Sequence, residues 1–194
     1  PTTSDITNGE VALDTSAKKL YVNDGGTVKE IGGGGGVTSD ANNNTIGGTN
    51  AGDSITSGTD NTFFGKDAGT DITDGQYNTF IGSLAGSNTN SGTYLNTFVG
   101  YNAGVNNGNG NHNVFLGANV GLNNEAWDNV FIGNYSGDAN TSGTQNVFVG
   151  KNSGTANTTG SYNTVLGFEA GKSLTTSSYG CLLYTSDAAD DDHC

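Results

Sequence analysis

One motif, Asn-Thr-Phe-Ile-Gly and close variants of it, returns every 16 to 18 residues through most of this chain. Eight copies begin at Asn44, Asn61, Asn78, Asn96, Asn113, Asn129, Asn146 and Asn163. A second glycine follows each motif glycine by four residues, directly after Ala, Ser or Val. Self-similarity at a short fixed period is typical of solenoids, in which each repeat forms one coil stacked on the last. The motif therefore predicts an all-β fold, a parallel β-solenoid (β-roll) of eight coils of about 17 residues.

Composition agrees with a solenoid better than with an ordinary globular domain. Only 32% of the 194 residues are hydrophobic, and 33 are glycine. Globular domains usually contain about 45–50% apolar residues, and a formal net charge of −13 would otherwise favour disorder. Stacked coils need few apolar residues each, because neighbouring coils share one thin core.

The repeats divide the chain into four segments. Residues 1–32 contain short alternating apolar runs, such as Leu20 and Val22, and predict a small β-hairpin or meander. Residues 33–43, which begin within a run of glycines, are expected to be a linker, and residues 44–178 the β-roll. Residues 179–194 leave the pattern and resemble a translated sequencing adapter. We expect an artefactual or disordered tail on a metagenomic fragment.

Two adjacent positions of the repeat strand are apolar in nearly every copy. The first column contains Phe63, Phe80, Phe98, Phe115, Phe131 and Phe148, and the second contains Phe64, Ile81, Val99, Leu116, Ile132 and Val149. Adjacent strand residues point to opposite faces, so one column fills the coil and the other needs a covering surface. The sequence leaves open which column faces inward. It predicts self-association, with a parallel homotrimer as the expected assembly.

Polar columns accompany the apolar ones. The eight motif asparagines should form a ladder, in which the amides bond to one another or to turn backbone. The next position is Thr45, Thr62, Thr79, Thr97 and Thr164 in five copies and valine in three. A threonine column could indicate an ice-binding solenoid. We instead expect this column to pack inward, because valine replaces threonine in it.

The repeat Asn-Thr-Phe-Ile-Gly-x-x-Ala-Gly resembles that of trimeric autotransporter adhesin heads (YadA-like β-rolls), and still more closely the longer repeats of phage tail fibres. The segment Gly-Glu-Val-Ala-Leu-Asp-Thr near the N-terminus is also similar to a small module of phage fibre proteins. The resemblance covers about residues 5–178. It implies a homotrimeric fibre on a virion or, as an alternative, on a bacterial cell surface.

Four aromatic residues precede the motif asparagines by one or two positions, namely Tyr77, Tyr94, Trp127 and Tyr162. They should lie along one edge of the stack, where aromatic faces could contact sugar rings. Packing over the coil corners or against a neighbouring chain is the alternative.

No constellation typical of an enzyme or a cofactor site stands out. Asp67, Asp71 and Asp74 could offer oxygens to Ca²⁺ or mimic the carboxylates of a tailspike-type glycan hydrolase, but they occur in one copy only. His112 has no second histidine or cysteine nearby. We therefore expect no catalytic residue, metal or cofactor. With 6 basic against 19 acidic residues, we expect no nucleic-acid partner, and without a long apolar run no membrane insertion.

Together these patterns predict a segment of an extracellular trimeric fibre for adhesion or recognition of a host-surface glycan. The main alternative is a purely structural spacer whose recognition region lies elsewhere in the parent fibre.

Overall fold

The computed structural model describes residues 7, 11–14, 19–24, 27–31, 37–90 and 92–183, and the chain divides into two compact units, Pro1–Val37 and Thr38–Cys194. The first unit contains an antiparallel three-stranded meander of β1 (Val11–Asp14), β2 (Lys19–Asp24) and β3 (Thr27–Ile31). The glycines expected to begin the linker lie outside the described residues. Among the residues that are described, no helix has the length and apolarity needed to cross a bilayer.

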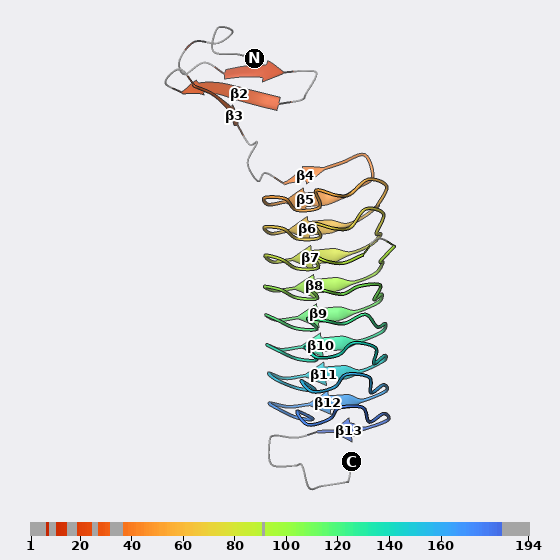
Figure 1. The fold of residues 1–194 in the computed structure, drawn as a ribbon. Coiled ribbons are helices and arrows are strands. Elements are labelled where there is room, and N and C mark those ends of the chain that lie inside the picture. Colours follow the sequence, from red (N-terminus) through yellow and green to blue (C-terminus); the bar gives the residue numbers. More distant parts are fainter. Residues whose placement is uncertain are drawn as a thin grey trace. The chain divides into compact units, whose positions relative to one another are not determined.

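The second unit is one ten-stranded sheet, in which each coil adds a single strand of three residues to the strand before it (Figure 1). The strands are β4 (Thr38–Ser39), β5 (Thr45–Gly47), β6 (Thr62–Phe64), β7 (Thr79–Ile81), β8 (Thr97–Val99), β9 (Val114–Leu116), β10 (Val130–Ile132), β11 (Val147–Val149), β12 (Thr164–Leu166) and β13 (Cys181–Leu182). From β5 to β13 all pairs are parallel and join equivalent residues, as Phe98 joins Phe115. The predicted parallel β-solenoid is confirmed.

Backbone conformations with positive φ form the corners of each coil. The residue before each motif asparagine is left-handed in every coil, whatever its type; examples are Tyr77 at φ 57° and His112 at φ 58°. The motif glycine lies at a more extreme φ, 138° at Gly117, which is open only to glycine. A Cβ there would also lie 2.8 Å from the backbone of Gly133 in the next coil. The motif glycines are therefore required by backbone conformation and by stacking distance together.

The first apolar column fills the interior of the coils. Phe63, Phe80, Phe98, Phe115, Phe131 and Phe148 are each fully buried, with ring centroids of neighbouring coils 4.7–5.3 Å apart. The residues that precede the second glycine, from Ala51 to Ala170, are buried as well, and those that are apolar belong to the same core. Each coil thus contributes one bulky apolar residue and one smaller residue to a shared interior, which explains how coils with so few apolar residues bury a core.

The motif asparagines form a buried ladder beside the phenylalanines. The Oδ1 atom of Asn113 accepts the backbone N–H of Asn129 in the next coil at 2.9 Å. The Nδ2 group of Asn113 donates to the backbone oxygen of Ala126 at 2.8 Å. Each ladder asparagine therefore bonds to backbone N–H and C=O groups at the corner that would otherwise have no partner.

A second inner column stands eleven residues after each ladder asparagine. Its members are Ile55, Ile72, Thr89, Asn107, Asn124, Asn140, Asn157 and Leu174. The four asparagines form a shorter ladder; Asn140 donates to Asn124 Oδ1 at 2.6 Å and Asn157 to Asn140 Oδ1 at 2.7 Å. Asn157 Oδ1 is buried without a partner, because Leu174 in the following coil offers no donor.

The first coil is covered by β4, which is antiparallel to β5. At the other end, Tyr179 and Gly180 occupy the positions of Tyr162 and Asn163 one coil later, and the Gly180 N–H donates to Asn163 Oδ1 at 2.8 Å. The stack thus extends past residue 178, the end that the motif predicts for it, to β13. Residues 184–194 of the expected tail lie outside the described residues.

Candidate functional site

The outer face of the solenoid sheet carries the second apolar column. Phe64, Ile81 and Leu166 are 49%, 39% and 48% exposed, and the column continues through Val99, Leu116, Ile132 and Val149, each partly exposed. Together with the first strand position of every coil, these residues make up what we call the outer sheet face. Within the described part of the single chain, nothing covers it.

The threonine and valine column lies on this outer sheet face, and the expectation that it packs inward is wrong. Val147, for example, is 37% exposed. The reason is the two-residue period of a strand: this column and the second apolar column lie two positions apart and must share one face. The interruption by valine and the bulky neighbours at Phe64 and Leu116 leave no continuous threonine array.

The four aromatic residues predicted for the coil edge lie on two neighbouring columns. Tyr94 and Trp127 precede the ladder asparagine by two positions, and Tyr77 and Tyr162 by one. All four are 43–55% exposed. The Tyr162 ring stacks on Tyr179 at 4.8 Å, whereas Tyr94 and Trp127 both line one shallow hollow. The sequence therefore predicts the edge on which these aromatic residues lie, and the structure shows that Tyr94 and Trp127 come together around one hollow.

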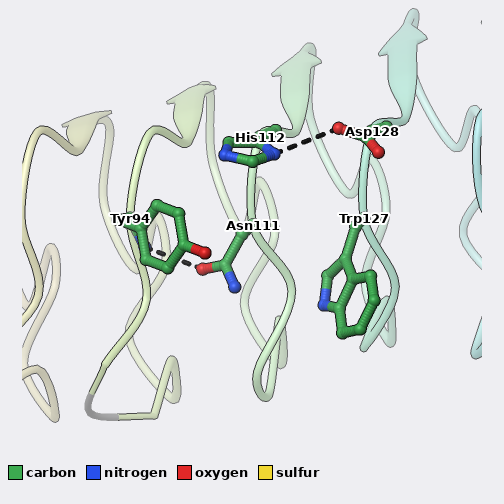
Figure 2. A pocket seen from close by; sticks show the side chains of 5 residues that line it. All are labelled: Tyr94, Asn111, His112, Trp127 and Asp128. Atoms are coloured by element: carbon green, nitrogen blue, oxygen red, sulfur yellow. Dashed lines mark hydrogen bonds and ion pairs between the residues drawn. The ribbon is translucent and has the colours of Figure 1, made fainter.

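The hollow spans three consecutive coils. Its lining residues are Tyr94, Asn111, His112, Trp127 and Asp128, around a volume of about 180 Å³. Figure 2 shows Asn111 between Tyr94 and Trp127 in one row, with His112 and Asp128 in the next. Residues of this kind, two aromatic groups around an amide and a carboxylate, can contact a small polar ligand by stacking and by hydrogen bonds.

Neighbouring coils hold these side chains in place. The His112 Nδ1 atom lies 3.1 Å from Asp128 Oδ1, and the Tyr94 and His112 rings meet edge to face at 5.3 Å. The Trp127 indole Nε1 donates to the backbone oxygen of Asn109 at 3.2 Å. The sequence pattern gives His112 no second histidine or cysteine as a partner and does not single out Asn111 or Asp128. Comparison of the two positions before each ladder asparagine across consecutive coils could have found all three.

Two members of the acidic cluster considered above as a source of oxygens for Ca²⁺ or of hydrolase-like carboxylates, Asp67 and Asp74, make other contacts. Asp67 pairs with Lys66 at 2.7 Å and accepts from Asn50 at 2.9 Å. The hydrogen bond from Lys66 holds the pKa of the Asp67 carboxyl below its usual value. Asp74 accepts the backbone N–H of Gly92 at 2.6 Å. Within the described ranges, no group of three His, Cys, Asp or Glu side chains is placed to hold a metal ion.

Comparisons with protein-family models, with curated proteins and with solved structures give no match to this chain.

Proposed function

We propose that this chain is a segment of an extracellular attachment fibre, carried by a virion or a bacterial surface, in which three copies associate through the outer sheet face. The observation that carries the proposal is the column of partly exposed large apolar residues from Phe64 to Leu166. A continuous apolar stripe of this kind marks an interaction surface in soluble proteins.

A second copy of the same chain is the partner that best matches this stripe. The column repeats with the coils, so a parallel copy in register presents the same side chains at every level. Closed symmetry around a threefold axis leaves none of the three stripes in water. The resemblance to adhesin heads and phage tail fibres supports three copies.

The molecular mass in solution tests the assembly. We expect light scattering to give three times the 19.6 kDa of one chain. Leu116→Lys places a charge in the stripe and should shift the protein to monomers. Thr159→Lys adds the same charge at an exposed position between β11 and β12 and should leave the mass unchanged. A monodisperse wild-type monomer would contradict the proposal.

A structural spacer is the second candidate function, because the stripe alone would serve a fibre that recognises nothing. Binding of the wild-type protein to host cells or purified glycans separates the two. The assembled protein should bind, and a spacer should not.

A further inference from the structure

The hollow lined by Tyr94 and Trp127 combines two exposed aromatic side chains with an amide and a carboxylate. We propose that it binds one neutral pyranose ring, which contacts the Tyr94 and Trp127 side chains at the two ends of the hollow and is bonded through its hydroxyls to Asn111 and Asp128. The inference rests on the proposed attachment function and names the class of ligand that the aromatic edge takes.

Both aromatic side chains are exposed yet held. Trp127 is 55% exposed, and its Nε1 group is fixed on Asn109 of the preceding coil at 3.2 Å. Tyr94 is 43% exposed, and its ring contacts His112. A ligand that stacks on side chains already immobilised does not have to offset their loss of rotational freedom. Held but uncovered aromatic faces are therefore the first feature that points to a ligand.

The spacing of the two aromatic residues suits a single ring. Their coils are separated by one other coil, which places the two backbones about 9.6 Å apart, or two strand spacings. Asn111 lies on the coil between them, so a single ring would lie over Asn111 with one aromatic side chain at each end. The hollow of about 180 Å³ is smaller than the roughly 300 Å³ at which pockets for drug-sized ligands begin. An oligosaccharide would thus place one residue in the hollow and extend outside it.

The polar groups between the aromatic residues offer one donor and one acceptor. Asn111 Oδ1 accepts the backbone N–H of Tyr94 at 2.8 Å, which fixes the amide orientation and leaves the Nδ2 group to donate elsewhere. Over the described part of the chain, no group accepts from that Nδ2. Asp128 contacts His112 through Oδ1, so Oδ2 is left to accept. Neighbouring sugar hydroxyls match such a pair, and the Asp128 carboxylate disfavours sialic or uronic acids by like-charge repulsion.

The rest of the aromatic edge lacks this combination. Tyr162 has one ring face against Tyr179 at an interplanar angle of 4°. Tyr77 lies beside Gln76, with no aromatic residue in the row that Tyr94 and Trp127 share. Tyr77 is 54% exposed, which makes it a matched control for an aromatic residue on the same edge but outside the hollow.

Trp127 is the only tryptophan of the chain, so its fluorescence reports on the hollow directly. The full chain would be titrated with D-glucose, D-galactose, D-mannose and N-acetyl-D-glucosamine up to about 100 mM, since the energy per atom of small ligands places a single ring in the millimolar range. We expect a saturable change with at least one of them. Tyr94→Ala should weaken binding at least about tenfold.

Two further variants sharpen the assignment. Asn111→Asp keeps an oxygen for the Tyr94 N–H but removes the amide donor, and it should weaken binding about fivefold or more. Tyr77→Ala should leave binding unchanged. The absence of saturable binding by all four sugars would overturn the subsite, as would equal losses in Tyr77→Ala and Tyr94→Ala.

The mass of the same sample separates this inference from the fibre proposal. If the protein associates and Trp127 then becomes protected from acrylamide quenching, a neighbouring copy covers the hollow, and the subsite is overturned while the fibre proposal stands. If the protein is a monomer that binds a sugar through Tyr94 and Asn111, the subsite stands and the trimeric fibre is overturned.

Discussion

A single ladder asparagine links three levels of the stack. Asn129 donates its backbone N–H to Asn113 Oδ1 at 2.9 Å and accepts the N–H of Asn146 at 2.9 Å. Its Nδ2 group also donates to the backbone oxygen of Gly143 at 2.9 Å. No other side chain of this size offers an acceptor and two donors at once, so the position tolerates little substitution.

Asn129→Ala should destabilise the protein by about 2–4 kcal/mol, because at least two buried backbone groups lose their partners at about 1–3 kcal/mol each. The midpoint of urea unfolding measures the effect. Asn123→Ala is the control: Asn123 also belongs to a stack of asparagines, accepting from Asn106 at 3.1 Å, but it is exposed. Water replaces its hydrogen bonds, so the change should stay within about 0.5 kcal/mol. Equal losses in the two variants would refute this account of the ladder.

Strand β4 covers the first coil, and Asp40 accepts hydrogen bonds there as the ladder asparagine of the preceding coil does in the later coils. Asp40 Oδ2 accepts the Asn44 amide at 2.8 Å, and Oδ1 accepts the backbone N–H groups of Asn42 and Asn44, each at 2.9 Å. Desolvation raises the pKa of this carboxyl, but the hydrogen bonds from Asn44 and Asn42 outweigh it, and the pKa lies below its ordinary value. The ladder therefore begins on a carboxylate.

The cap should weaken in acid. A carboxyl with a lower pKa in the folded than in the unfolded state stabilises the fold above the unfolded pKa of about 3.9, and this contribution is lost as the pH falls through the folded pKa. Asp40→Asn removes the charge at every pH. The melting temperature of wild type should exceed that of Asp40→Asn at pH 7, and the gap should close below about pH 4. A gap that stays constant down to pH 2 would contradict the assignment of the cap to the ionised carboxyl.

Across the whole solenoid unit, each coil contacts only its neighbours. Pairing runs from β12 to β11 to β10 without any longer-range strand pair in this sheet, as far as the chain is described. Stability in such a stack is close to a sum of coils and interfaces between them, so the number of coils can change without changing the fold.

Deletion of residues 130–146 should give a folded protein that is one coil shorter. Asn129 then joins Val147, which keeps the motif intact and places Asn157 on Asn124 in the second ladder. We expect a β-sheet circular dichroism spectrum and cooperative melting. Deletion of residues 130–137, half a coil, breaks the register and should unfold the coils on both sides. Comparable melting of the two deletions would be inconsistent with a stack held together by register.

Sequence reasoning placed the strands, the coil length and the ladder correctly because all three depend on the repeat period alone. It also placed Tyr94 and Trp127 on one edge. The threonine column was predicted on the wrong face. Asn61 and Phe63 lie two positions apart in the strand, so a buried asparagine ladder requires the phenylalanines on the inner face of the sheet and Thr62 on the outer face. The second asparagine column was not predicted, because only four coils carry it, from Asn107 to Asn157.

The sequence alone determined that equivalent residues stack, since any chain with this period brings position i against position i + 17. Only the tertiary structure decided which column faces inward, which polar groups stay unpaired and where Asn111 meets Tyr94 and Trp127. The repeat period sets the contacts between coils along the stack. The contacts around one coil depend instead on how the left-handed corners turn the backbone. Residue types as different as Tyr77, Leu95 and His112 occupy those corners, so the residue type does not reveal the turn.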